Sequence, residues 1–259
     1  MTETLDRVKE QYRLRTKLPV YKRRVAFSLS AIEEYLLRDT FYMSFSGGKD
    51  SLALLHLVST IKAVPIVFID SGAELDATHN CISEIEALGH KVLRYYPKLS
   101  IVEMCKQAAF WGAETDNEVT WKLSQWRETL LNEPARRALA DTGVSAICLG
   151  LRKSENRGRL MMLNKYGIEF VRQDGMKIFS PIANWHGDDV IAYCLENDLP
   201  ISSEYLSPAD SMRDRESRRT GTMLGTSGTT HGRFQVFRRE HPALWAKMLA
   251  EFPRLSRMT

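Results

Sequence analysis

The six residues Ser-Gly-Gly-Lys-Asp-Ser at positions 46–51 constrain this chain more than any other segment. They lie between an apolar run that ends at Phe45 and a helical pattern that begins at Leu52. Glycines let backbone N–H groups approach anionic oxygens closely, and a helix that follows turns the positive end of its dipole toward them. This glycine loop predicts a strand, a phosphate-binding turn and a helix. Its candidate phosphate-binding residues are Ser46, Gly47, Gly48 and Ser51.

The charged residues of the glycine loop exclude one common type of phosphate site. A Walker A loop needs a glycine, four further residues and then Gly-Lys-Ser/Thr. Here Lys49 is followed by Asp50, and Met43 stands five positions before Gly48. Lys49 can neutralise a phosphate as a point charge. The negative charge of Asp50 cannot stay uncompensated beside phosphates, so we expect Asp50 to bind Mg2+ or to accept hydrogen bonds from backbone N–H groups. The structural alternative is a glycine-rich turn that binds nothing.

The composition sets the class of protein without naming an activity. A chain of 259 residues has room for one large α/β domain with extensions, or for two small domains. Hydrophobic residues make up 44% and charged residues 26%, as in soluble globular proteins. A formal net charge of +4 permits acidic ligands but does not by itself indicate nucleic acid. No apolar run approaches membrane-spanning length and the N-terminus is not signal-like, so we expect a cytoplasmic protein.

The cysteines argue against a local metal or redox site. Cys81, Cys105, Cys148 and Cys194 stand far apart and form no Cys-x-x-Cys pair. A zinc knuckle, a local iron–sulfur site and a dithiol pair are therefore unsupported. Three of the four lie in apolar stretches and are expected to be buried, reduced thiols.

We expect three segments along the chain. Residues 1–39 predict an N-terminal extension of two helices, joined by a basic connection at 17–24. Residues 40–206 predict a nucleotide-binding domain. Residues 207–259 predict a basic C-terminal extension, with a glycine- and threonine-rich lid or linker at 220–232 and a last helix from Pro242 to Phe252.

From residue 40 onward, short apolar runs alternate with helical stretches. The expected strands are 41–45, 64–69, 91–95 and 145–150, and the clearest helices between them are 52–61 and 75–88. Apolar residues on consecutive positions are typical of strands buried in a parallel sheet. The predicted fold class is therefore α/β, with a doubly wound, mostly parallel sheet. Ligands of such sheets bind beyond the carboxyl ends of the strands.

Polar residues follow two more of these strand ends. Asp70 and Gly72 come after the second strand, where Asp70 is a candidate for Mg2+ or ribose binding; the alternative is a cap for the next helix. Gly150 and Arg152 follow a later strand. Arg157 and Arg159 come about a helical turn further on, and guanidinium groups suit phosphate or sulfate.

In this order, the motifs resemble those of the phosphoadenosine phosphosulfate (PAPS) reductase family, within the PP-loop ATP pyrophosphatases. The resemblance spans about residues 40–206. It includes the glycine loop, Asp70 with Gly72, Gly150 with Arg152, and a segment with Pro181 and Trp185 before a helix. The resemblance implies an adenine nucleotide alpha hydrolase-like fold. It also implies that the glycine loop and the arginine segment bind phosphate or sulfate, with adenine near residues 68–70.

The chain departs from the reductases of that family in its cysteines. Those enzymes attack sulfate with a cysteine near the C-terminus, usually within Glu-Cys-Gly-x-His. Here the last cysteine is Cys194. The stretch Arg-Arg-Thr-Gly-Thr at 218–222 stands where relatives often carry Gly-Cys, and it holds threonine in place of cysteine. Threonine is a far poorer nucleophile near neutral pH.

The expected activity is therefore that of an ATP pyrophosphatase. It would use ATP and Mg2+, release pyrophosphate and transfer AMP to an acceptor, with Lys49, Asp50 and Arg152 as catalytic residues and Asp50 and Asp70 as metal ligands. Two alternatives stay open: a PAPS or APS reductase-like enzyme, and a non-catalytic adenine-nucleotide-binding module.

The resemblance also implies partners. Relatives in DNA phosphorothioation work beside a cysteine desulfurase, so we expect a sulfur donor protein of that type, with DNA as a candidate acceptor. The basic tail after residue 206 could follow a nucleic-acid backbone, but a solvated helix surface or an oligomer contact explains it equally well. We also expect a homo-oligomer and no membrane partner.

Overall fold

The computed structural model describes residues 2–72, 74–107, 123–202, 205–206, 238 and 242–253. The chain divides into two compact units. The first unit contains residues 1–68, 77–93 and 138–220, and the second contains 69–76, 94–137 and 221–259. The glycine loop belongs to the first unit.

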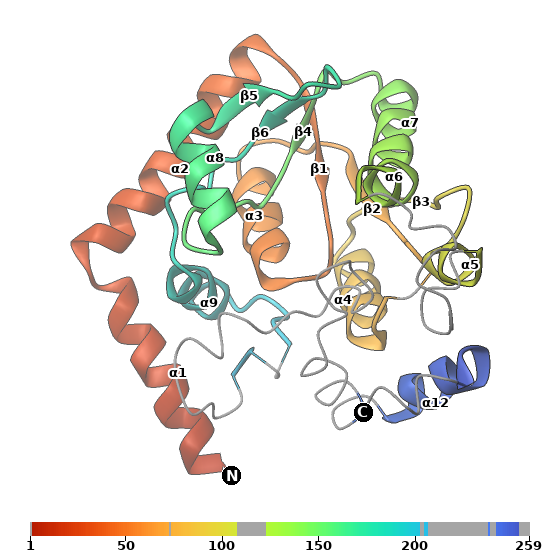
Figure 1. The fold of residues 1–259 in the computed structure, drawn as a ribbon. Helices are drawn as coiled ribbons and strands as arrows, with labels where there is room; N and C mark the ends of the chain where they lie inside the picture. Colours follow the sequence, from red (N-terminus) through yellow and green to blue (C-terminus); the bar gives the residue numbers. More distant parts are fainter. Residues whose placement is uncertain are drawn as a thin grey trace. The chain divides into compact units, whose positions relative to one another are not determined.

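The described strands form one mixed sheet in the order β3-β2-β1-β4-β6-β5 (Figure 1). Their bounds are β1 Phe41–Ser44, β2 Ile66–Ile69, β3 Val92–Tyr95, β4 Ala146–Cys148, β5 Glu169–Val171 and β6 Lys177–Phe179. β1 lies between β2 and β4 and is parallel to both, with Met43 opposite Ile66 on one side and Cys148 on the other. β6 is parallel to β4, and β5 closes this edge as an antiparallel strand. The predicted α/β class and mostly parallel sheet are confirmed.

The strand order places a topological switch point beside β1. From β1 the chain proceeds to β2 on one side, and it later returns to β4 on the other side. The connections that leave β1 and β4 therefore diverge at the carboxyl edge of the sheet, which is where open α/β sheets bind ligands.

The helices are close to those that the sequence predicts. In the first unit they are α1 Thr2–Thr16, α2 Pro19–Arg38, α3 Lys49–Ser59, α4 Asp76–Ala87, α8 Arg157–Tyr166 and α9 Gly187–Glu196. In the second unit they are α5 Ile101–Gln107, α6 Leu123–Arg127, the π-helix η1 Glu128–Asn132 and α12 Pro242–Glu251, and α7 Glu133–Thr142 begins there. The predicted last helix is confirmed, whereas the segment at 220–232 lies outside the described residues.

Each unit has its own apolar core. In the first, β1 and α3 supply a run of fully buried side chains that includes Phe41, Met43 and Leu54. In the second, Leu75, Met104 and Trp126 pack with residues of α12. Trp126 is thus a packing residue.

The N-terminal helices join the first core. Val8, Tyr12 and Ile32 are buried members of it, and Tyr35 stacks on Phe179 of β6 with ring centroids 4.4 Å apart. The predicted connection at 17–24 is too long. Helix α2 already begins at Pro19, because proline suits the first helical turn.

Polar contacts also tie the N-terminal helices to the segment around Trp185. The indole Nε1 donates to Ser28 Oγ at 2.9 Å, and Ser28 Oγ donates to the Pro181 carbonyl at 2.8 Å. The carboxylate of Asp189, at the start of α9, is fully buried and accepts from Arg15 at 2.7 Å and Arg24 at 2.6 Å.

None of the described helices combines the length and the apolar character that a membrane span needs.

Candidate functional site

The glycine loop forms the turn between β1 and α3. Gly48 is the N-cap residue of α3, so the helix begins at Lys49, three residues earlier than its apolar pattern predicts. Lys49, Asp50 and Ser51 thus occupy the first helical turn. The backbone N–H groups of this turn lie at the positive end of the helix, where anions bind.

Gly47 is required by two independent features of the turn. Its φ is +68°, a left-handed conformation that side chains disfavour. A Cβ built on it would lie 2.9 Å from Thr78 Cγ2 and 3.2 Å from the Thr78 Cα in α4. The loop therefore packs directly on α4, and only glycine fits.

The two serines of the loop contact each other. Ser51 Oγ donates to the Gly48 carbonyl at 2.8 Å and accepts the backbone N–H of Ser46 at 3.2 Å. Ser51 thereby connects the start of the loop with the first turn of α3. The phosphate contacts predicted for these residues remain predictions.

Three charged side chains meet beside the loop. Asp50 Oδ1 accepts from Arg152 Nε at 2.5 Å, and Asp50 Oδ2 lies 3.2 Å from Lys49 Nζ. The Arg152 side chain is 1% exposed, the Lys49 side chain 4% and the Asp50 side chain 23%. We call Lys49, Asp50 and Arg152 the charge cluster.

The charge cluster stabilises the ionised form of Asp50. Burial raises the pKa of a carboxyl group, but the positive charges of Lys49 and Arg152 outweigh it and hold the pKa of Asp50 below its ordinary value. The carboxylate is therefore negatively charged at neutral pH, next to a loop expected to receive anions.

Gly150 lets the segment after β4 approach α3. A Cβ at Gly150 would lie 3.2 Å from the Asp50 carbonyl carbon and 3.4 Å from the Asp50 Cβ. Arg152 reaches Asp50 from this segment, so the cluster lies at the switch point between β1 and β4. The structure brings together Gly150, Arg152 and the loop, as the sequence predicts.

A pocket of about 340 Å³ adjoins the glycine loop within the first unit. Lys49 is part of its wall, and Lys49 Nζ lies 5.0 Å from the centroid of the Tyr205 ring. The lining residues come from the loop, α3, α4 and the segment after α9: Gly47, Lys49, Leu52, Ala77, Asn80, Cys81, Glu84, Pro200, Ile201, Ser202 and Tyr205. The contributions of α4 and of residues 200–205 were not predicted, because no motif marks them.

Asp70 and Gly72 lie in the second unit, directly after β2. Asp70 Oδ1 accepts the backbone N–H of Gly72 at 2.9 Å, which closes a local turn. Gly72 has a φ of +88°, and a Cβ there would lie 3.0 Å from the Ser100 Cβ. Both residues thus shape a turn of the second unit, and their predicted roles in ribose or metal binding stay predictions.

Arg157 and Arg159 open helix α8. The Asn156 side chain caps this helix by accepting the Arg159 N–H at 2.9 Å, and the Arg159 side chain forms an ion pair with Glu155. Arg157 is exposed. The predicted contact of both arginines with an anion stays a prediction.

The Mg2+ ligation predicted for Asp50 and Asp70 stays a prediction. Among the described residues, no group of three or more His, Cys, Asp or Glu side chains could hold a metal. The two oxygens of Asp50 each face a cation, and Asp70 Oδ1 is held by its own turn.

The described thiols are buried, as predicted. Burial and the nearby Glu84 raise the pKa of Cys81 to about 11. Burial also raises the pKa of Cys148 and Cys194 well above the ordinary range of thiols. These thiols stay protonated near neutral pH and are poor nucleophiles.

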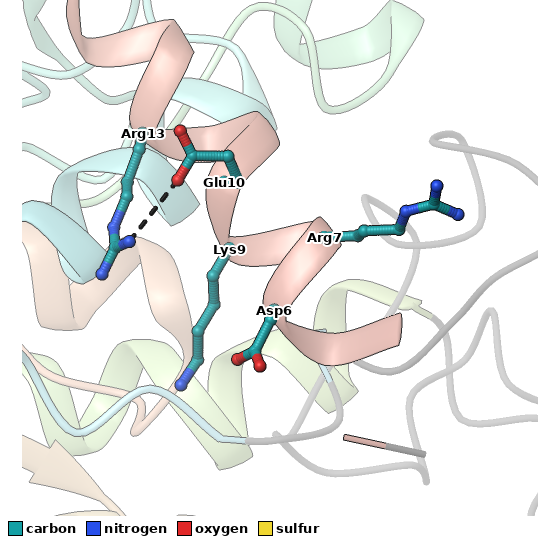
Figure 2. A pocket seen from close by; sticks show the side chains of 5 residues that line it. All are labelled: Asp6, Arg7, Lys9, Glu10 and Arg13. Carbon is teal, nitrogen blue, oxygen red and sulfur yellow. Dashed lines mark hydrogen bonds and ion pairs between the residues drawn. The ribbon is translucent and has the colours of Figure 1, made fainter. Parts of the chain in front are cut away.

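A second hollow, of about 470 Å³, lies on helix α1 (Figure 2). Its lining residues, Asp6, Arg7, Lys9, Glu10 and Arg13, all come from this one helix. Arg13 pairs with Glu10 at 3.4 Å, and Figure 2 shows Arg7 pointing away from the others. An open hollow of mixed charge on a single helix does not make a specific site.

Comparisons with known proteins agree with this geometry. The phosphoadenosine phosphosulfate reductase domain family matches residues 40–208. Similar proteins include phosphoadenosine 5'-phosphosulfate reductases from Synechococcus sp., 27% identical over 61% of this chain and 66% of that protein, and from Vibrio cholerae, 28% identical over 68% of each. The chain spans about two thirds of the length of these relatives.

A solved structure has the same fold. The phosphoadenylyl-sulfate reductase from Candida auris, crystallised as a phosphate complex, superposes with a TM-score of 0.55 at 21% identity, over 86% of this chain and 95% of that one. The family match covers well over half of the chain and includes both the glycine loop and the charge cluster. The chain therefore belongs to the phosphoadenosine phosphosulfate reductase domain family, a family of PP-loop nucleotide-binding proteins.

Proposed function

We propose that this chain binds a sulfonucleotide of the PAPS type, with the sulfate or its neighbouring phosphate at the glycine loop, and takes part in transfer of the sulfo group. The observation that carries the proposal is the charge cluster, built on the loop at the switch point of the sheet. The names of the relatives favour a sulfonucleotide over ATP as the substrate.

Each part of the site has a role in this proposal. The N–H groups at the start of α3 bind the anionic oxygens, and Lys49 supplies a positive charge from the pocket wall. Charge that develops on the leaving phosphate is stabilised by the same groups, which already contact the bound substrate when the reaction begins. The apolar side chains of Leu52, Pro200 and Ile201 limit the access of water.

The sulfo transfer needs a thiol from a donor. A thiolate attacks the sulfur atom, the bond between sulfur and the bridging oxygen breaks, and adenosine 3',5'-bisphosphate leaves with the electron pair. A second thiolate then attacks the sulfur of the donor that carries the sulfo group, which releases sulfite and leaves a disulfide. We expect a dithiol protein or a small dithiol as donor, because Cys81, Cys148 and Cys194 are buried and protonated.

An ATP pyrophosphatase is the second candidate. One observation favours it: the described cysteines are buried, which makes them poorly placed as nucleophiles. ATP with Mg2+ would then lose pyrophosphate as AMP passes to an acceptor oxygen. A DNA phosphate as acceptor, and a cysteine desulfurase as sulfur donor, belong to this candidate.

A product assay separates the two candidates. The protein is incubated with PAPS and a dithiol in one reaction, and with ATP and Mg2+ in another, each with and without DNA. Sulfite and adenosine 3',5'-bisphosphate support the leading proposal, whereas AMP and pyrophosphate support the second. Binding of both nucleotides with no turnover would favour the non-catalytic binding module over both enzymes.

A further inference from the structure

Asp50 contacts a different cation with each of its carboxylate oxygens. Arg152 Nε lies 2.5 Å from Oδ1, and Lys49 Nζ lies 3.2 Å from Oδ2. A carboxylate beside a site for anions repels its ligand unless its charge is neutralised. The arrangement must therefore supply enough positive charge for both Asp50 and the ligand.

The two cations are held very differently. Arg152 is fixed deep in the protein: Nη1 donates to Ser154 Oγ at 2.8 Å, and Ser154 Oγ donates to the Trp185 carbonyl at 3.1 Å. Lys49 lies on the wall of the pocket, on a stem with four rotatable carbons. Lys49 can turn toward a ligand in the pocket, whereas Arg152 keeps its direction toward Asp50.

We propose that Asp50 is the resting counter-ion of Lys49 and that an arriving sulfate or phosphate takes over Lys49 while Arg152 alone keeps Asp50 neutralised. Arg152 is then a positioning residue that acts through Asp50 and does not bind the anion. This inference rests on the proposed function, since it needs anion binding at the glycine loop. It differs from the expectation that Arg152 stabilises the anion directly.

Removal of Arg152 distinguishes these two roles. In an Arg152→Met variant, Lys49 is the cation left beside Asp50 within the cluster, so Lys49 is held back from the ligand. If Lys49 turns to the ligand all the same, Asp50 is left with an uncompensated charge next to the bound anion. A second change, Asp50→Asn, removes both penalties and should restore binding. If Arg152 contacted the anion directly, the double variant would still lack that contact and would bind far more weakly than Asp50→Asn.

The experiment is a double-mutant cycle read out as the dissociation constant of adenosine 3',5'-bisphosphate, measured by calorimetry in EDTA. We expect Arg152→Met to weaken binding at least about tenfold and the double variant to bind within about threefold of Asp50→Asn. A double variant that binds about tenfold or more weakly than Asp50→Asn overturns the inference. The matched control is the Arg172–Asp174 ion pair, at 2.8 Å next to β5, with Arg172→Met, Asp174→Asn and both together.

Asp50→Asn alone keeps the test valid if Arg152→Met does not fold. Asparagine retains the acceptor for Arg152 and releases Lys49, so the anion should bind at least as tightly as in the wild type. A loss of about tenfold or more in Asp50→Asn overturns the inference. If added Mg2+ strengthens binding in the wild type but not in this variant, Asp50 is instead a metal ligand. If the wild type does not bind the bisphosphate, the proposed function fails; if it binds but the variants behave otherwise, the inference fails by itself.

Discussion

Gly47 and Thr78 are in such close contact that a single methyl group cannot be inserted between them, since a Cβ at Gly47 would lie 2.9 Å from Thr78 Cγ2. The contact joins the glycine loop to α4, which also lines the pocket. The position of the loop is therefore set by a neighbouring helix as well as by its own sequence.

Gly47→Ala should lower stability and abolish nucleotide binding. The left-handed backbone and the contact with Thr78 together should reduce the free energy of unfolding by about 3 kcal/mol. Gly143 is a matched control, because its φ of +66° is nearly the same and nothing lies within 4 Å of its built Cβ. Gly143→Ala should cost about 1 kcal/mol and leave binding unchanged. Equal losses in chemical denaturation would show that the Thr78 contact has no effect.

Lys49→Ala should abolish turnover and leave the fold intact. The variant removes a charge that faces the pocket, so we expect kcat/KM to fall by at least about 100-fold. Lys62→Ala, an exposed lysine after the end of α3, is the control and should behave like the wild type. A stable Lys49→Ala enzyme with full activity would contradict the proposed site.

Asp189→Asn should destabilise the protein and change its response to acid. The side chains of Arg15 and Arg24, which pair with Asp189, are 23% and 21% exposed. We therefore expect a loss of about 2 kcal/mol at neutral pH, less than for a wholly buried pair. Thermal unfolding of the variant and of the wild type measures this loss of stability.

The same variant tests the pKa of Asp189. Burial raises this pKa, but the N–H of His186 and the charges of Arg15 and Arg24 outweigh it, so the folded-state pKa lies below its ordinary value. The stabilisation is then complete above the unfolded-state pKa and is lost as the pH falls toward the folded-state pKa. The difference in melting temperature between the two proteins should shrink below about pH 4. A difference that does not change with pH would argue against this pairing.

The described cysteines should resist alkylation in the native state. Cys105→Ser removes the one thiol whose side chain lies outside the described set. In that background, iodoacetamide at pH 8 should label none of the remaining thiols, whereas all three should react in denaturant. Mass spectrometry counts the labels. Rapid native labelling of Cys81, which lines the pocket, would revive a nucleophilic role for it.

The sequence predicts local structure better than it predicts contacts between residues that are far apart in the chain. The glycine loop and the sheet around it could be predicted, because runs of apolar residues and a glycine-rich turn have few structural solutions. The pairing of Asp50 with Arg152 could not, since it joins residues 102 positions apart through the packing of two strands. The contribution of Tyr205 to the pocket carries no motif at all.

For the N-terminal helices, too, the sequence predicts the element but not what it packs against. The spacing of Val8 and Tyr12 predicts an amphipathic helix, but the pattern does not say what covers its apolar face. The structure assigns these residues to the main core, together with Ile32 and Tyr35.

The contact between Ser28 and Trp185 has a consequence for how this protein is divided into parts. Ser28 lies outside the region that matches the family, which begins at residue 40, yet its hydroxyl accepts the indole N–H of a residue inside that region. Trp185 in turn accepts from Ser154, which holds Arg152. The boundary of the family match therefore lies inside a connected set of hydrogen bonds. A transplanted or minimal version of the nucleotide site would have to carry the N-terminal helices with it.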